Sequence, residues 1–177
     1  MHRFYLKKLE ASIIFYLLKI KILLNSYYFG MIKSMNIKIK RFDKSLPLPE
    51  YKTSGAAAFD LYARETVTIL PGEVGLIPLN VAIEIPQGYF ILIVNRSSTF
   101  KMGITSANGV GIGDSDYCGD NDEYRFAARN YIKEPVTIEK GTRCCQMLIL
   151  PVQQVNIQDV DHLENADRGG FGTTGNR

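Results

Sequence analysis

From Met35 onward, apolar and polar residues alternate in short runs that are typical of β-strands. Such alternation places every second side chain on one face of a sheet. The clearest examples are Ile37/Ile39, Val67/Ile69, Val81/Ile83/Ile85 and Val136/Ile138. Two other runs, residues 89–94 and 147–150, are apolar throughout and predict strands that are buried on both faces.

Turn-forming residues separate these runs at regular intervals, as in Pro71-Gly72, Pro86-Gln87-Gly88 and Glu139-Lys140-Gly141. Many short strands at this spacing predict an all-β fold, a jelly-roll-like barrel or sandwich. A chain of 177 residues is long enough for one such domain. We expect the β domain to span residues 35–165 and to be followed by a flexible, Gly-rich C-terminal arm, residues 166–177.

The first 34 residues differ from the rest, because they combine apolar runs with six Lys or Arg and one Glu. Lys19 and Lys21 interrupt the apolar run, so it is a poor candidate for a membrane-spanning helix. Three interpretations remain open: a surface-lying amphipathic helix, a degenerate signal sequence, or an upstream extension before a start at Met31 or Met35. The last is favoured, since a strand-like run begins directly at Met35.

Charge and residue content exclude several classes of function. Residues 35–177 carry 15 basic and 17 acidic side chains, so a concentrated basic face for nucleic acid is not expected. Three cysteines, two of them adjacent, predict no disulfide framework and favour a cytoplasmic setting. Only two histidines are present, which nearly excludes a His-based triad or a multi-His metal site. Acid or base chemistry must fall mainly to carboxylates.

A first candidate group, residues 95–99, directly follows a predicted buried strand. It contains Arg96, Ser97 and Ser98, and a guanidinium beside hydroxyl groups suits phosphate oxygens. Taken alone, the run is more often an ordinary polar turn than a phosphate site. A second Arg and a Gln, Arg143 and Gln146, lie on a later predicted strand, where an Arg is more often structural than a ligand contact.

The stretch from Asn108 to Asp120 is the second candidate, because its four glycines let the backbone approach a ligand closely. Main-chain groups there could read a planar base, with Tyr117 packing on a sugar or base. Five carboxylates between Asp114 and Glu123 suggest a calcium loop instead. An EF-hand that starts at Asp114 would need Glu at its twelfth position, where Arg125 stands, which argues against that interpretation.

The tail carries a third candidate, a Gly/Thr run behind Arg168 that contains Phe171. Such a run can surround phosphates with N–H and hydroxyl donors, and the ring can stack on a base. Its place at a terminus excludes the strand, loop and helix of a P-loop.

Taken in order, these segments resemble the five motifs of the trimeric dUTPase family, with residues 57–63 (Ala-Ala-Phe-Asp-Leu-Tyr-Ala) as the first. The resemblance spans about residues 35–175. It implies a homotrimer that hydrolyses dUTP to dUMP and pyrophosphate, lowering dUTP and supplying dUMP for dTMP synthesis. Mg²⁺ would be held mainly by the triphosphate and water, with no direct protein ligand, and each site would draw on three subunits.

The resemblance also assigns roles to individual residues. Asp114 would be the general base that activates water for attack on the α-phosphorus, with Asp60 in a supporting role. Tyr117 would lie under the deoxyribose and exclude a 2′-hydroxyl, and the tail would close over the nucleotide as a lid. The substrate-binding residues implied are Arg96, Ser97, Ser98, Asn108, Gly111, Ile112, Gly113, Tyr117, Gln146, Arg168, Phe171, Gly172, Thr173 and Thr174.

Several positions depart from the family pattern. Cys118 stands where Arg is usual, Gly113 where Ile or Val is usual, and Asn95 where Pro or Gly is common. The stretch from Asp120 to Glu123 adds about three residues, and only two glycines separate Arg168 from Phe171.

Two alternative functions remain open. A dCTP deaminase, or a bifunctional deaminase and dUTPase, shares the fold and would use a Glu at the base, for which Glu123 is the candidate. A nucleotide-sensing regulatory protein with weak catalysis is an alternative of another class. Membrane association is not expected unless residues 1–34 anchor the chain.

Overall fold

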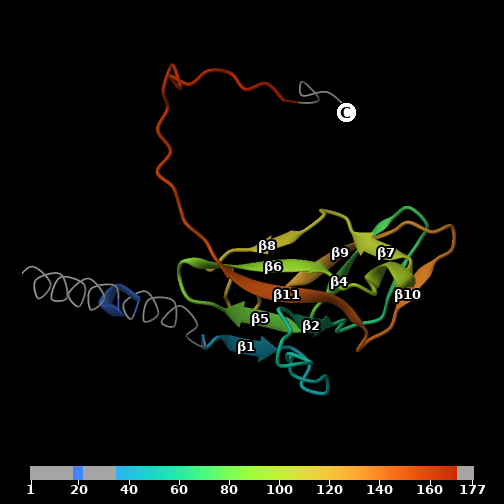
Figure 1. The fold of residues 1–177 in the computed structure, drawn as a ribbon. Coiled ribbons are helices and arrows are strands. Elements are labelled where there is room, and N and C mark those ends of the chain that lie inside the picture. Colours follow the sequence, from blue (N-terminus) through green and yellow to red (C-terminus); the bar gives the residue numbers. More distant parts are fainter. Residues whose placement is uncertain (1–17, 22–34, 171–177) are drawn as a thin grey trace, which may run out of the picture.

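The computed structural model describes residues 18–21 and 35–170, and the regular secondary structure of residues 35–170 is almost entirely β-strand (Figure 1). Residues 18–21 form a short helical segment with exposed side chains. The other elements are β1 Lys38–Arg41, β2 Phe59–Tyr62, β3 Val67–Ile69, β4 Val74–Pro78, β5 Val81–Glu84, β6 Tyr89–Asn95, the 3₁₀ helix η1 Thr99–Met102, β7 Ile104–Ser106, β8 Gly111–Gly113, β9 Arg125–Asn130, β10 Val136–Ile138 and β11 Arg143–Pro151. The predicted all-β fold is confirmed.

The strands form a sandwich of antiparallel sheets. The largest sheet has the order β2-β11-β6-β8, a three-stranded sheet has the order β4-β9-β7, and β1-β5 and β3-β10 form two-stranded sheets. Side chains of both larger sheets meet in one core, for example Ile91 and Met147 with Ile77 and Phe126. The predicted turns at residues 71–72, 86–88 and 139–141 lie between strands.

The two all-apolar runs are buried on one face only within a single chain. In β6, Ile91 and Ile93 are buried, whereas Phe90, Leu92 and Val94 remain partly exposed. In β11, Met147 is buried, while residues 148–150 are partly exposed. The prediction of burial on both faces was therefore wrong for the isolated chain, although Ile149, like Met147, packs against the core.

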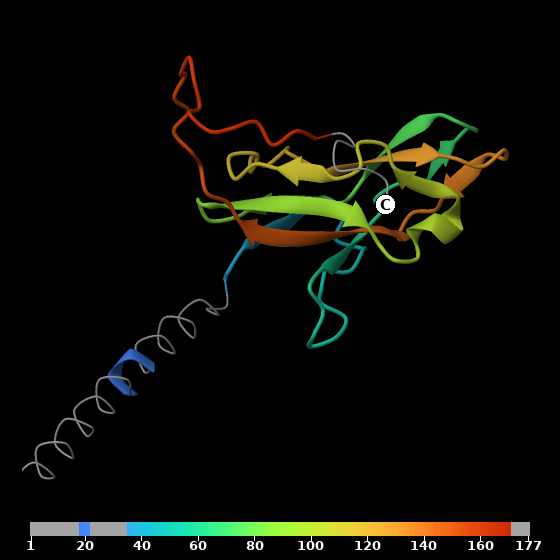
Figure 2. The ribbon, with the colours of Figure 1, turned by 45° about the horizontal axis from the view of Figure 1, so that its top comes forward.

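After Pro151 the chain leaves the sandwich. Figures 1 and 2 show residues 152–170, here called the C-terminal segment, running away from the end of β11. Its side chains are exposed, including Ile157 at 93% and Leu163 at 80%. Val155 is likewise 73% exposed, so the apolar side chains of this segment do not pack on the sandwich of the same chain.

The interpretations of residues 1–34 fall mostly outside the described part of the chain. Within that part, no helix is long and apolar enough to cross a membrane. All three cysteines lie in it and are free thiols, Cys118 exposed and Cys144 and Cys145 buried.

Candidate functional site

A group of charged and polar side chains gathers where β6 ends, and we call Asp60, Arg96, Arg143 and Gln146 the Arg96 cluster. Asp60 on β2 accepts hydrogen bonds from Arg96 Nε at 2.7 Å and from Arg143 Nη1 at 2.9 Å. Arg96 Nη1 also donates to the Arg143 carbonyl at 2.9 Å. One carboxylate thus holds two guanidinium groups, which leaves the cluster with excess positive charge.

Strand pairing brings Gln146 into the same cluster. Gln146 lies opposite Val94 on β6 and Asp60 on β2, and its Nε2 donates to the Asn95 carbonyl at 3.0 Å. The sequence segments around Asp60, Arg96 and Gln146 therefore meet in space. Arg143, which the sequence suggested was structural, belongs to the cluster as well, because a bulge between Arg143 and Cys145 shifts its register against β2.

The hydroxyl groups that follow Arg96 have different environments. Ser97 is exposed and Ser98 is partly exposed. Thr99 is fully buried, and its Oγ1 donates to the Cys144 carbonyl at 3.0 Å while accepting from the Arg96 N–H at 2.9 Å. Of the three hydroxyls in this turn, the one on Thr99 therefore shapes the backbone, which leaves Ser97 and Ser98 as candidates for a ligand.

The glycine-rich stretch contains one short strand, β8, which pairs with β6 and is an edge strand of its sheet. Gly109 has a φ of +72° in the turn, a conformation that favours glycine. Ile112 is 67% exposed, and Asn108 is exposed. Because β8 pairs on one side only among the described strands, alternate main-chain N–H and C=O groups on its other edge are open to a planar ligand.

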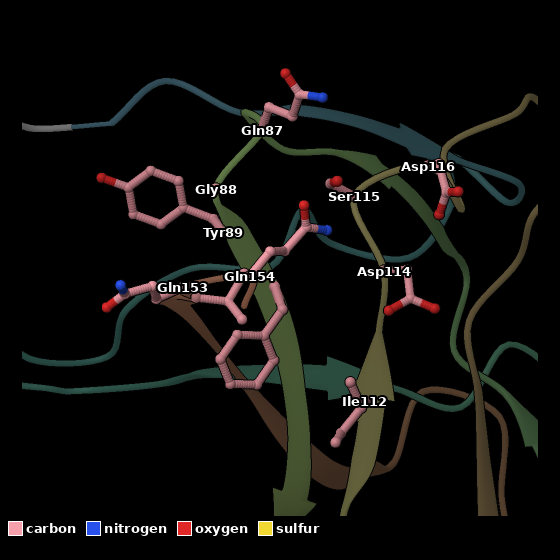
Figure 3. Close-up of a pocket in the computed structure, with 11 residues that line it drawn as sticks. Gln87, Gly88, Tyr89, Ile112, Asp114, Ser115, Asp116, Gln153 and Gln154 are labelled. Carbon is pink, nitrogen blue, oxygen red and sulfur yellow. The ribbon is translucent and has the colours of Figure 1, made fainter. Parts of the chain in front are cut away.

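Asp114 directly follows β8 and lines a cavity of about 1000 Å³ (Figure 3). Its side chain is exposed and so can reach water or a ligand. The other lining residues come from the turn before β6 and its first residues, from β8 and the residues after it, and from the start of the C-terminal segment: Gln87, Gly88, Tyr89, Phe90, Ile112, Ser115, Asp116, Val152, Gln153 and Gln154. The glutamines carried no motif signal in the sequence, since only folding brings these segments to the cavity.

Tyr117 lies beyond Asp114 and is 41% exposed. Its hydroxyl donates to the Glu123 carbonyl at 3.3 Å, and its ring packs edge-on against Tyr124 with centroids 5.3 Å apart. One face of the ring is therefore supported while part of the side chain remains accessible.

The cavity at Asp114 and the Arg96 cluster lie at opposite ends of β6. Gly113 pairs with Ile91, so Asp114 lies near the start of β6, whereas Arg96 follows its last residue. Six strand residues between these levels span roughly 20 Å. One chain therefore does not bring Asp114 and Arg96 to the same phosphate group.

Glu123, the candidate for deaminase chemistry, is occupied elsewhere. Its side chain is 7% exposed and accepts from Arg64 Nε at 2.7 Å, Arg64 Nη2 at 2.9 Å and the Asn80 N–H at 3.0 Å. The hydrogen bonds that Arg64 donates to Glu123 raise the pKa of the Arg64 guanidinium. A carboxylate held in this way anchors the stretch 120–123 to the sandwich. It is not free to contact the nucleobase of a substrate.

We expect Glu123→Ala to destabilise the fold by about 3 to 5 kcal/mol, because the change leaves Nε and Nη2 of Arg64 and the buried Asn80 N–H without their acceptor. Urea unfolding of the variant beside the wild type measures the difference. Glu84→Ala, which removes an exposed ion pair with Lys38, is the control and should cost under about 1 kcal/mol. Equal losses in the two variants would contradict a structural role for Glu123.

The tail residues are only partly described. Arg168 is exposed in the C-terminal segment, whereas Phe171, Gly172, Thr173 and Thr174 lie outside the described residues. Their assigned contacts with a nucleotide stay predictions.

Comparison with known proteins agrees with this arrangement. The dUTPase family model matches residues 44–175. The chain is 45% identical over 149 residues to a deoxyuridine 5′-triphosphate nucleotidohydrolase of Caldanaerobacter subterraneus subsp. tengcongensis, covering 80% of this chain and 99% of the relative.

Solved structures share the fold. A point mutant of the Staphylococcus bacteriophage 80alpha dUTPase with dUpNHpp superposes with a TM-score of 0.70 at 23% identity, covering 80% of this chain and 99% of that one. A mutant dUTPase from phage phi11 of S. aureus, which coordinates a structural Mg(II) ion, gives 0.65 at 20% identity, covering 73% and 99%. The family model and the sequence relative together show that the chain belongs to the dUTPase family.

Proposed function

We propose that the protein hydrolyses dUTP to dUMP and pyrophosphate. One observation carries the proposal beyond family membership: Asp114 is an exposed carboxylate in a cavity, directly after an edge strand whose backbone is open to a base. A carboxylate in that place can accept a proton from water while the base is held beside it.

Asp114 orients a water molecule and takes its proton as the oxygen attacks the α-phosphorus. Pyrophosphate leaves, and dUMP retains the new oxygen. Arg96, Ser97, Ser98 and Gln146 bind phosphate oxygens and stabilise the charge that develops there. Asp60 supports this step by fixing the Arg96 guanidinium, to which it is bound at 2.7 Å.

Selection of the base and sugar falls to the glycine-rich stretch that contains β8. Main-chain groups of Gly111, Ile112 and Gly113, with Asn108 in the turn, bind uracil at the open edge of β8. The Tyr117 ring lies under the deoxyribose, where a ribose 2′-hydroxyl would clash. The support of that ring by Tyr124 favours this role, because a fixed ring excludes a hydroxyl better than a mobile one.

Mg²⁺ fits this site as a partner of the substrate. Among the described residues, no three His, Cys, Asp or Glu side chains gather in a way that could hold a metal. The ion would be held through triphosphate oxygens and water, and it would neutralise phosphate charge.

The active form is proposed to be a homotrimer whose sites combine residues of three subunits. The separation of Asp114 from Arg96 along β6 supports shared sites. The half-exposed apolar face of β6 and β11 and the exposed apolar side chains of the C-terminal segment supply surfaces for neighbouring subunits.

Residues 35–165 are proposed to form the catalytic domain, and residues 1–34 are proposed to be an extension outside it. The proposed location of the protein is the cytoplasm. Free thiols at all three cysteines agree with a reducing compartment. Liposome flotation of chains that start at Met1 and at Met35 separates an extension from a membrane-binding segment.

Residues 166–177, including Arg168, are proposed to close over the bound nucleotide, with Phe171 stacked on the base and Gly172, Thr173 and Thr174 around the γ-phosphate. Ending the chain after Asn165 should lower kcat/KM for dUTP about 100-fold or more, because bulk water is no longer excluded and phosphate contacts are lost. Steady-state kinetics measure the loss, and the thermal midpoint should stay unchanged because the removed residues that are described are exposed. Full activity without them would contradict the lid.

Pyrophosphate release from dUTP, dCTP, dTTP and UTP with Mg²⁺ tests the proposed function on the full chain. Release from dUTP alone is expected. Ammonia release from dCTP would favour the deaminase, although the engagement of Glu123 argues against it. Tight dUTP binding without turnover would favour the regulatory protein.

A further inference from the structure

A buried tyrosine lies directly beneath residues 113–118, here called the Asp114 loop. The Tyr124 side chain is only 6% exposed. A Cβ atom added to Gly113 would lie 2.6 Å from both Cε1 and Oη of that ring. The ring therefore occupies the space in which a side chain at position 113 would lie, and the absence of one at Gly113 is what allows the loop to rest on it.

Tyr124 also contacts the far end of the same loop. Its ring packs against Tyr117 at an interplanar angle of 78°, and its hydroxyl donates to the Tyr117 carbonyl at 3.5 Å. Tyr117 in return donates to the carbonyl of Glu123, the residue before Tyr124. One side chain thus supports both the residue before Asp114 and the tyrosine three residues after it.

The backbone of Tyr124 is fixed to the sandwich. Its N–H donates to the Val81 carbonyl, and its carbonyl accepts from the Leu79 N–H, both at 2.9 Å. The preceding residue, Glu123, is bound to Arg64 and to the Asn80 N–H. Burial raises the pKa of the Tyr124 phenol, so the hydroxyl remains a donor at any working pH.

We propose that Tyr124 is a positioning residue, which sets where Asp114 and Tyr117 lie relative to the substrate. This inference rests on the proposed dUTP hydrolysis and deepens it, since the Tyr124 side chain contacts both ends of the Asp114 loop. Tyr124 does not touch the substrate. Because its backbone is hydrogen-bonded to the sandwich, the Tyr124 side chain holds Asp114 and Tyr117, which contact the substrate, in fixed positions.

Four variants test the proposal: Tyr124→Phe, Tyr124→Ala, Gly113→Ala and the double variant Gly113→Ala/Tyr124→Ala. Gly75→Ala is a matched control, because its added Cβ would meet Ile69 Cγ1 at 2.7 Å in another sheet. The measurements are kcat and KM for dUTP and UTP, the thermal midpoint, and hydrogen exchange of the amides of residues 113–118.

Gly113→Ala and Tyr124→Ala should each lower kcat for dUTP by about 10- to 100-fold, the loss expected from a displacement of about 1 Å. Each should also lower the ratio of kcat/KM for dUTP to kcat/KM for UTP. Amide hydrogen exchange in the Asp114 loop should become faster. Gly113→Ala should add little in the Tyr124→Ala background, because the clash is gone. Tyr124→Phe keeps the ring and should cost about fivefold or less.

Gly75→Ala should lower the thermal midpoint while leaving the nucleotide preference and the exchange of residues 113–118 unchanged. If the Tyr124 and Gly113 variants behave in the same way as Gly75→Ala, the proposal is overturned and Tyr124 is an ordinary core residue. A wild type that fails to hydrolyse dUTP would refute the proposed function separately. In that case amide hydrogen exchange tests the proposed role of Tyr124 without an activity assay. Unchanged exchange in the variants would overturn that role, and faster exchange confined to residues 113–118 would support it.

Discussion

Asp114→Asn is expected to lower kcat for dUTP by about 10²- to 10⁴-fold, with KM nearly unchanged. Asparagine keeps the size and hydrogen bonding of the side chain but cannot accept the proton of the attacking water. Asp114 is exposed at the edge of the cavity, so the substitution should not disturb the core. Pyrophosphate release under saturating dUTP and Mg²⁺ measures the loss.

Asp116→Asn is the matched control for this experiment. Asp116 is a second exposed carboxylate that lines the same cavity, two residues further along the chain. It should retain activity within a few-fold, because removing one nearby exposed charge has a small effect in water. Equal losses in both variants would point to general electrostatics, and full activity of Asp114→Asn would remove Asp114 as the base.

Chains carrying Asp114→Asn and chains carrying Arg96→Ala should each be almost inactive alone and should regain activity when co-assembled. The two positions are roughly 20 Å apart along β6, so a shared site takes Asp114 from one subunit and Arg96 from another. In a random one-to-one mixture, about a quarter of the sites should be intact. Such a site needs Asp114 from an Arg96→Ala chain and Arg96 from an Asp114→Asn chain, and each occurs with a chance of about one half.

Co-expression with two different affinity tags, followed by sequential purification, yields the mixed assemblies. A second mixture, in which the Arg96→Ala chain also carries Asp114→Asn, contains no intact site and should stay inactive. Failure to regain activity in confirmed mixed assemblies would show that each site is built within one chain.

The motif residues could be found from sequence because their chemistry is local. Arg96, Ser97 and Ser98 follow a run of apolar residues, and the glycines around Ile112 mark a backbone that a ligand can approach. Each single motif fitted more than one function, whereas the order of the five motifs along the chain indicated one family. What the order did not show was the role of Arg143, which enters the Arg96 cluster through strand pairing and a bulge.

Arg143 joins a candidate site that the sequence did not assign to it, whereas Glu123 and Thr99 lie beside candidate sites but have structural roles. Glu123 is the candidate for deaminase chemistry, and Thr99 ends the candidate group 95–99. In the structure the Glu123 carboxylate is satisfied by Arg64 and the Asn80 N–H, and the Thr99 hydroxyl by the Cys144 carbonyl. Their partners lie 43 to 59 residues away for Glu123 and 45 for Thr99, so no local pattern could reveal them.

By itself, the sequence determined the all-β fold, the turns and the family, since alternation, turn residues and motif order are properties of neighbours along the chain. Only the tertiary structure decided which of these residues meet. It placed Asp114 and Arg96 at opposite ends of one strand and set Tyr124 against Gly113. The reason is physical: antiparallel pairing joins residues far apart in sequence, and their register depends on how the whole core packs.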